Sequence, residues 1–207
     1  MRDLELVAGA DDAAIARWIA SRLAAALAAS EGAVAICLPG GSTPFPILAE
    51  LVKHPLDWER VVAYPGDDRI VPEDHPASNT GKLRALLEPQ GARVQALALD
   101  TAPPHFALVW LGMGADGHIA SLFPNTDQRR DDPARARSLT PDPLPPEAPF
   151  DRITLTIPAL LECDAMMFVI RGRDKRAVLD AAIAGEHDLP VARLLSARGR
   201  LPVTCFV

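Results

Sequence analysis

FALVWLGMGADGHIASLFP occupies residues 106–124, and the rest of the chain is organised around this segment. An apolar run from Phe106 to Leu111 leads into three glycines, one carboxylate and one imidazole. Such a run is typical of a buried strand, and glycines allow a tight loop where the strand ends. The sequence therefore predicts that Asp116 and His118 lie at the carboxyl edge of a sheet, where open α/β sheets bind their ligands. We expect the small residues after His118 to open a helix.

A second strand-to-loop transition precedes this segment. The short apolar run at residues 34–38 leads directly into Gly40, Gly41, Ser42, Thr43 and Pro44. Ser42 or Thr43 can cap the helix that follows, and Pro44 suits its first position. A strand, a glycine turn and a helix N-terminus together form a phosphate-binding geometry. An ordinary capped turn is the alternative, because the spacing fits neither the Walker nor the dinucleotide fingerprint.

A third transition follows the strand expected at residues 60–64. Asp67, Asp68 and Arg69 come just after it, and Ser78 and Asn79 follow a short distance along the chain. Two carboxylates and a guanidinium past a strand end are well placed for a binding site. A solvated turn with a surface ion pair is the alternative. Ser78 or Asn79 can cap a helix that runs to about residue 87.

The remaining elements follow from hydrophobic periodicity and from capping signals. The expected helices span residues 12–30, 44–52, 159–162, 174–184 and 190–196, and the expected strands span residues 4–7, 94–99, 152–157, 165–170 and 202–207. Residues 129–150 are rich in proline and are expected to form a surface loop. A place beside the site entrance is the alternative for this loop. Alternating strands and helices predict one α/β/α domain over residues 1–207.

Composition excludes several classes of protein. The chain has 207 residues, of which 49% are hydrophobic and 23% are charged, as in ordinary globular domains. A formal net charge of -6 argues against a nucleic-acid surface. The three cysteines lie far apart and form no C-x-x-C pair, so we expect free thiols and no metal site. No apolar stretch reaches membrane-spanning length and no signal-peptide pattern is present, so we expect a cytoplasmic protein without membrane contact.

Taken together, these motifs resemble those of the 6-phosphogluconolactonases. The resemblance covers nearly the whole chain in order: Gly-Gly-Ser-Thr-Pro at 40–44, Asp-Asp-Arg at 67–69, Ser-Asn at 78–79, the glycine-rich motif at 112–124, Arg152-Ile-Thr-Leu-Thr, and Gly172 to Lys175. It implies a three-layer α/β/α sandwich with a mostly parallel, modified Rossmann-like sheet, which the family shares with the glucosamine-6-phosphate deaminases. It also implies hydrolysis of 6-phosphoglucono-1,5-lactone in the oxidative pentose phosphate pathway, with no cofactor and no metal.

Two residues depart from the family pattern. Asp68 stands where a glutamate is expected, so its carboxylate has about one methylene less reach. Asn125 stands where a glycine usually follows Phe-Pro, and asparagine tolerates left-handed backbone better than most residues do. Neither departure removes the imidazole, so we expect an active enzyme.

The resemblance also suggests a role for each candidate residue. His118 is the expected general base, because an imidazole changes charge near neutral pH. Loop amides or Arg69 would stabilise the oxyanion, and Asp116 would shape the loop or contact a sugar hydroxyl. Arg152 and Lys175 are the expected cationic partners of the substrate phosphate. The other expected binding residues are Gly40, Gly41, Ser42, Thr43, Asp67, Ser78, Asn79, Gly114 and Gly117.

Two other functions compete with this interpretation. A glucosamine-6-phosphate deaminase shares the fold, but its loop carries a glutamate after the histidine, and residues 119–124 contain no carboxylate. A non-catalytic sugar-phosphate sensor would carry a DNA-binding segment, and the chain shows no basic helix-turn-helix pattern. An acyl-enzyme of the Ser-His-Asp type is disfavoured because no G-x-S-x-G elbow exists. The expected partner is a phosphorylated sugar lactone, and the sequence leaves open whether the chain is a monomer or a homodimer.

Overall fold

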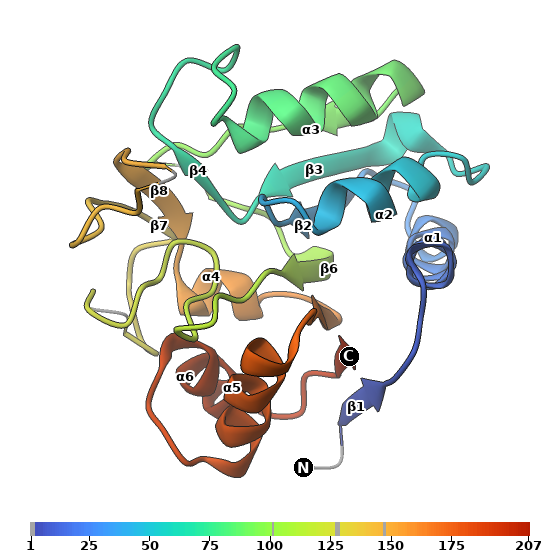
Figure 1. The fold of residues 1–207 in the computed structure, drawn as a ribbon. Coiled ribbons are helices and arrows are strands. Elements are labelled where there is room, and N and C mark those ends of the chain that lie inside the picture. Colours follow the sequence, from blue (N-terminus) through green and yellow to red (C-terminus); the bar gives the residue numbers. More distant parts are fainter. Residues whose placement is uncertain (1–2, 101, 127–128, 147) are drawn as a thin grey trace.

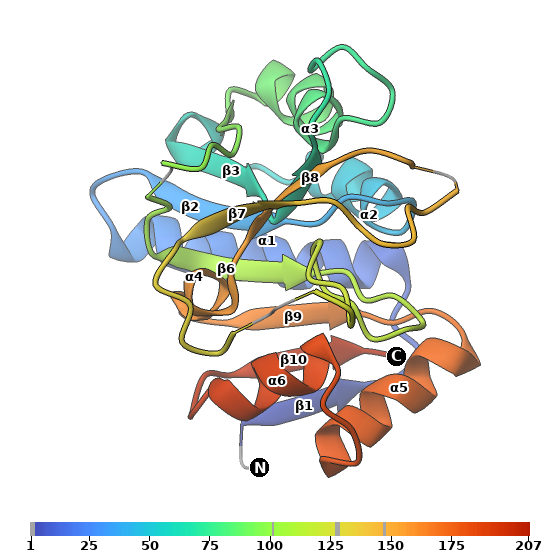
Figure 2. The same cartoon turned by 90° about the vertical axis from the view of Figure 1, so that its left-hand side faces the viewer.

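The computed structural model describes residues 3–100, 102–126, 129–146 and 148–207. Its centre is a parallel sheet in the order β1-β10-β9-β6-β2-β3-β5. Figure 1 shows the whole chain, and Figure 2 labels the strands from β1 to β3 in this order. The bounds of these strands in chain order are Leu4–Val7 for β1, Val34–Leu38 for β2, Val61–Pro65 for β3, Arg93–Val94 for β5, Phe106–Leu111 for β6, Met166–Val169 for β9 and Val203–Phe206 for β10. β2, β6 and β9 lie inside the sheet and are almost wholly buried, which explains their unbroken apolar sequences.

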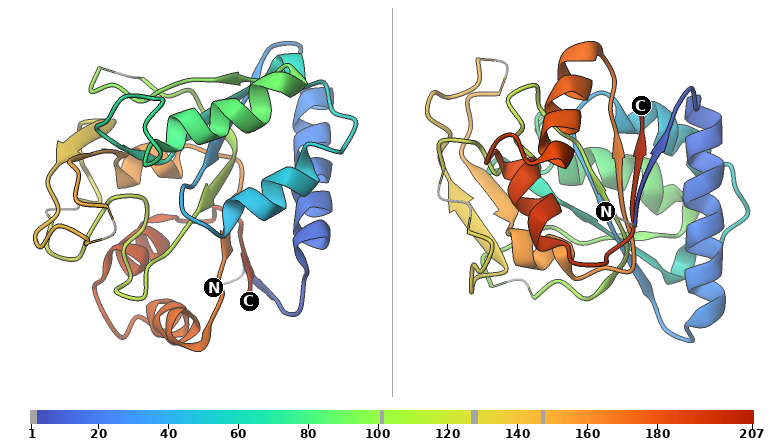
Figure 3. Two further views of the ribbon diagram at one scale, coloured as in Figure 1. Left: turned by 45° about the horizontal axis from the view of Figure 1, so that its top comes forward. Right: turned by 90° about the horizontal axis from the view of Figure 1, so that it is seen from below.

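Helices cover both faces of this sheet and complete the predicted three layers. One face packs against α1 (Asp12–Ala29), α2 (Pro44–Leu51) and α3 (Asn79–Leu87). The other packs against α4 (Ile157–Leu161), α5 (Arg173–Ala184) and α6 (Pro190–Ala197). Figures 2 and 3 show α1 on the opposite side of the sheet from α5 and α6. Alternate residues of β6 supply the two separate apolar cores, because neighbouring side chains point to opposite faces.

A second, antiparallel sheet lies beside the first and has the order β4-β8-β7. Its strands are β4 (Asp67–Arg69), β7 (Ala136–Leu139) and β8 (Arg152–Leu155). The residues of β4 were expected in a loop, and those of β7 in the proline-rich surface loop. Both expectations were wrong, because three or four residues without apolar alternation give no strand signal. These segments are held as strands by pairing with β8, a contact distant in sequence.

Four further local predictions need correction. The expected strand at residues 94–99 shortens to β5, and two short 3₁₀ turns occur at Trp58–Arg60 and Glu88–Gln90. No helix follows His118: residues 112–124 stay a loop with isolated bridges, and Ala120 adopts a positive φ of 48°. Thr43 precedes α2 without making a side-chain cap bond. The predicted starts of α1 and α3 are confirmed, since Asp11 caps α1 and Ser78 caps α3. The start expected for α4 at residue 159 was wrong, because β8 ends at Leu155 and Thr156 caps a helix that begins at Ile157.

The three cysteines are free and buried, as predicted. Among the residues that the structure describes, no helix is long and apolar enough to cross a bilayer.

Candidate functional site

A cavity of about 500 Å³ opens where the loops after β2, β6 and β9 meet the second sheet. It collects most of the residues that the sequence analysis selected: Gly40, Gly41, Ser42, Thr43, Asp67, Arg69, Asn79, Gly114, His118, Arg152 and Lys175. These residues come from positions up to 135 apart in the chain, so only the fold brings them together. The carboxyl edge of the sheet is therefore the candidate active site, as expected for this architecture.

His118 is held by its neighbour Asp116. The Nδ1 atom of His118 lies 2.6 Å from Oδ1 of Asp116, and the same oxygen accepts the backbone N–H of His118 at 3.2 Å. The Phe123 ring flanks the imidazole at a centroid distance of 4.9 Å. Because Nδ1 is engaged, Nε2 is the ring nitrogen available to the cavity. Asp116 is absent from the cavity wall, so its position fits the support of His118 better than the predicted contact with a sugar hydroxyl.

Gly114 makes room for this pair. A Cβ at this position would lie 2.2 Å from Nδ1 of His118 and 2.4 Å from Oδ1 of Asp116. The loop amides expected to face the substrate are already used, because Gly114 N–H donates to the His118 carbonyl and Gly117 N–H to the Gly114 carbonyl. These two glycines shape the loop, and their N–H groups are not directed at a ligand.

The three polar side chains of β4 lie on two different faces of the strand. Side chains alternate between the two faces of a strand, so Asp67 and Arg69 share one face and Asp68 takes the other. Asp67 and Arg69 line the cavity, whereas Asp68 is buried at the N-terminus of α3. The shorter carboxylate that departs from the family pattern therefore lies outside the cavity wall.

Asp67 forms a partly buried contact that the sequence did not predict. Ser121 donates its hydroxyl to Oδ2 of Asp67 at 2.5 Å. Its backbone N–H donates to the Thr154 hydroxyl at 3.2 Å. Burial raises the pKa of the Asp67 carboxyl, and the Ser121 hydroxyl and Arg69 partly oppose the rise. Ser121 thus ties the loop that carries His118 to both β4 and β8.

Cationic groups gather at another part of the wall. Arg69 and Arg152 are directly opposite each other in the β4–β8 pair, so their side chains share a face. Arg152 is only 3% exposed, and it donates to the carbonyls of Phe150 at 2.9 Å and Ala148 at 2.7 Å. Burial and the neighbouring Arg69 lower the pKa of Arg152. Lys175 joins this wall from the first turn of α5.

Two predicted binding residues have structural roles instead. The hydroxyl of Ser78 accepts the Gly81 N–H at 3.0 Å as the cap of α3, and the side chain is absent from the cavity wall. Gly117 has a φ of 78°, and a Cβ there would lie 2.8 Å from the Leu189 side chain. Its carbonyl accepts the Val191 N–H at 3.1 Å. Gly117 therefore lets the loop pack against the start of α6.

The proline-rich segment contributes to the site after all. Pro145 and Ala148 line the cavity, which supports the alternative that this segment borders the entrance. The carbonyls that Arg152 holds belong to the same segment. Sequence reasoning missed these residues because neither side chain carries polar chemistry.

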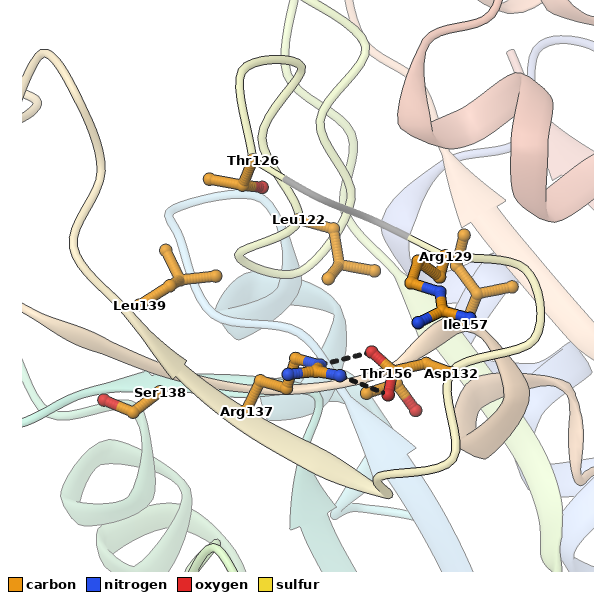
Figure 4. A pocket seen from close by; sticks show the side chains of 9 residues that line it. All are labelled: Leu122, Thr126, Arg129, Asp132, Arg137, Ser138, Leu139, Thr156 and Ile157. Atoms are coloured by element: carbon orange, nitrogen blue, oxygen red, sulfur yellow. Dashed lines mark hydrogen bonds and ion pairs between the residues drawn. The ribbon is translucent and has the colours of Figure 1, made fainter.

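A second, smaller cavity of about 190 Å³ lies beside β7 (Figure 4). Its polar floor is an ion pair in which Nη2 of Arg137 donates to Oδ1 of Asp132 at 2.7 Å. This bond lowers the pKa of Asp132, so the pair stays ionised at neutral pH. The cavity contains none of the predicted site residues. Within the described parts of the chain, no cluster of three or more His, Cys, Asp or Glu residues could hold a metal ion.

Comparison with known proteins identifies the family. The model of the glucosamine-6-phosphate isomerases/6-phosphogluconolactonase family matches residues 10–96 and 88–203. The chain belongs to this family. A 6-phosphogluconolactonase of Pseudomonas putida is 37% identical over 206 residues, which cover 88% of this chain and 84% of the relative. One from Mesorhizobium japonicum is 32% identical over an alignment of 214 residues, and the match covers 93% of this chain and 89% of the relative.

Solved structures of family members share the fold. The crystal structure of a 6-phosphogluconolactonase from Shewanella baltica superposes with a TM-score of 0.83 at 27% identity, covering 99% of this chain and 97% of that one. The one from Thermotoga maritima gives a TM-score of 0.82 at 24% identity, covering 99% of both chains. The predicted three-layer fold of the family is therefore confirmed.

Proposed function

We propose that this chain hydrolyses 6-phospho-D-glucono-1,5-lactone to 6-phospho-D-gluconate in the oxidative pentose phosphate pathway. The observation that carries the proposal is that His118, which Asp116 holds from outside the cavity wall, lines the same cavity as Arg69, Arg152 and Lys175. An imidazole can activate water, and the cations and the glycine turn suit a phosphate dianion. We further propose that the chain acts in the cytoplasm, as a monomer or a homodimer, on this small substrate alone.

In the proposed reaction, His118 acts as a general base through Nε2. It removes a proton from water while the water oxygen forms a bond to the lactone carbonyl carbon. The tetrahedral intermediate then collapses, and the bond between that carbon and the ring oxygen breaks. The imidazolium returns its proton to the ring oxygen, which becomes the new hydroxyl group. Asp116 accepts a hydrogen bond from Nδ1 throughout, which favours the tautomer with a free Nε2 and stabilises the imidazolium.

The oxyanion of the intermediate needs an N–H donor or a cation. Of the two sources that the sequence suggests, the amides of Gly114 and Gly117 donate inside the loop. Arg69 is the other source: it lines the same cavity as His118, and its Nη1 donates to Oδ1 of Asn79 and to the Ala77 carbonyl. The missing carboxylate after His118 supports lactone hydrolysis over deamination, because the proposed chemistry needs only one base.

The direct test supplies freshly generated lactone and couples its hydrolysis to 6-phosphogluconate dehydrogenase. We expect product formation well above the spontaneous rate. Release of ammonia from glucosamine 6-phosphate would instead support the deaminase, and binding of a sugar phosphate without turnover would support the sensor.

The phosphate site has its own test. We expect Lys175→Ala to raise KM for the phosphorylated lactone and to leave unphosphorylated gluconolactone little affected. An equal effect on both lactones would contradict the assignment of Lys175 to the phosphate.

A further inference from the structure

We propose that Asp68 is a positioning residue for the phosphate end of the site: it fixes the start of α3 so that Asn79 holds Arg69 beside the glycine turn at Gly40. This inference rests on the proposed lactonase function. Asp68 itself does not line the cavity, so it acts through Asn79 and Arg69.

The carboxylate of Asp68 organises the first turn of α3. Oδ1 accepts the N–H of Asn79 at 2.6 Å, and Oδ2 accepts the N–H and the hydroxyl of Thr80 at 2.9 and 2.6 Å. Oδ2 also accepts the Ser78 hydroxyl at 3.2 Å. Asp68 is only 6% exposed. Hydrogen bonds and the positive end of the helix offset the cost of burying this charge, so the carboxylate orders the helix start.

Asn79 transmits this order to the cavity. Its Nδ2 donates to the Asp67 carbonyl at 2.8 Å, and its Oδ1 accepts from Nη1 of Arg69 at 2.7 Å. The side chain also fills the space in which a Cβ of Gly40 would lie, with a separation of only 2.1 Å. Asn79 therefore touches the glycine turn and Arg69 at the same time. This places the Arg69 guanidinium near the glycine turn that would hold the phosphate.

An anion would relieve a repulsion at this point. Arg69 and Arg152 share a face of the second sheet, and Arg69 contributes to the lowered pKa of Arg152. Two guanidinium groups on one cavity wall favour a doubly charged, multidentate ligand such as a phosphate. Asn79 and the Ala77 carbonyl, which accepts from the same Nη1 at 3.2 Å, hold Arg69 in place before the ligand arrives.

The closing experiment compares Asp68→Asn with wild type on the phosphorylated and the unphosphorylated lactone. The groups around the Asp68 carboxylate all donate hydrogen bonds to it, and the amide of the asparagine would place two further N–H donors among them. The first turn of α3 should therefore lose its fixed position. We expect KM for the phosphorylated lactone to rise about tenfold with kcat within about twofold. Gluconolactone turnover should stay within about twofold. Asp68→Glu keeps a carboxylate, so its KM should lie between that of Asp68→Asn and that of wild type.

Leu87→Val is the matched control, because Leu87 is fully buried at the other end of α3 and lies outside this network. It should lower the melting temperature without raising KM. If Asp68→Asn fails to fold, Thr80→Val takes its place, because it removes the hydrogen bond from the Thr80 hydroxyl to Asp68. Calorimetry then measures the binding of 6-phosphogluconate to this variant, and weaker binding than in wild type supports the proposal.

Three results would overturn the inference. The first is an unchanged KM in Asp68→Asn or, if that variant does not fold, unchanged binding of 6-phosphogluconate by Thr80→Val. The second is an equal loss of activity on both lactones, and the third is an equal rise of KM in Leu87→Val. A wild-type chain that turns over no lactone would instead contradict the proposed function.

Discussion

Oδ1 of Asp116 lies 2.6 Å from Nδ1 of His118, and it binds the backbone N–H of the same residue. One carboxylate oxygen thus fixes both the ring and the main chain of the proposed base. The side chain of Asp116 is 52% exposed and that of His118 is 33% exposed, so the pair is open to solvent and can contact a water molecule. This geometry gives Asp116 a defined chemical role that its place two residues before the histidine did not reveal.

Asp116→Asn should therefore lower kcat by about 10²-fold or more, because the amide no longer stabilises the imidazolium or selects its tautomer. KM should change little. Since Asp116 is half exposed, the melting temperature should remain close to that of wild type. The measurement is a steady-state assay beside a thermal melt. Retention of near wild-type kcat by a folded Asp116→Asn protein would remove Asp116 from the mechanism.

Gly114→Ala should damage the same pair by sterics alone. The new methyl group would lie 2.2 Å from Nδ1 of His118, so the ring or the loop must move. Gly32→Ala is the control, because Gly32 lies outside the cavity wall and its methyl group would meet only the Ser30 hydroxyl oxygen at 3.9 Å, an ordinary contact. We expect kcat to fall at least about tenfold in the first variant and to stay within about twofold in the second. Equal activity in both would show that the pair tolerates displacement.

Much of the fold was predictable because the apolar runs are strong signals. β2, β6 and β9 are buried on both faces, so each reads as a continuous apolar segment followed by a polar turn. The second sheet was not predictable in the same way. β4 and β7 are short and polar, and their pairing with β8 depends on contacts that only the complete fold provides.

The site shows the same division. His118, Lys175 and the glycine turn were predicted as site residues because their residue types indicate the chemistry that they can perform. Asp68 was expected near the others because it is adjacent in sequence, but strand alternation sends it to the opposite face of β4. The bond from Ser121 to Asp67 was not predicted, because no local pattern indicates a partner 54 residues away. The sequence predicts which groups could react, whereas the contacts that hold these groups emerge only from the structure.

Asp67→Asn should change the pH dependence of stability. Burial raises the pKa of Asp67 above its ordinary value of 3.8. Its contribution to stability is therefore complete below that value and is lost as the pH rises through the raised pKa. The asparagine variant escapes this loss, so its melting temperature relative to that of wild type should rise as the pH rises from 3.8 through the raised pKa of Asp67 and stay level above it. Thermal melts across a pH series test this. A difference that is constant with pH, or that reverses at neutral pH, would contradict it.

Arg152→Lys tests the second role of Arg152, as the anchor of the segment that borders the cavity. A lysine cannot reproduce two separate bonds to the carbonyls of Ala148 and Phe150. We expect a loss of about 2–4 kcal/mol in the free energy of unfolding, measured by urea denaturation. Arg176→Lys, in an exposed pair with Asp180, should lose less than about 0.5 kcal/mol. Equal losses would show that the carbonyl bonds contribute little.

The most direct test of the central claim is the hydrolysis of freshly generated 6-phosphogluconolactone by His118→Ala, with the spontaneous rate subtracted. A general base contributes about 10²- to 10⁴-fold, so kcat should fall by at least about 10²-fold while 6-phosphogluconate still binds. A folded His118→Ala protein that retains near wild-type kcat would contradict the assignment of His118 as the base.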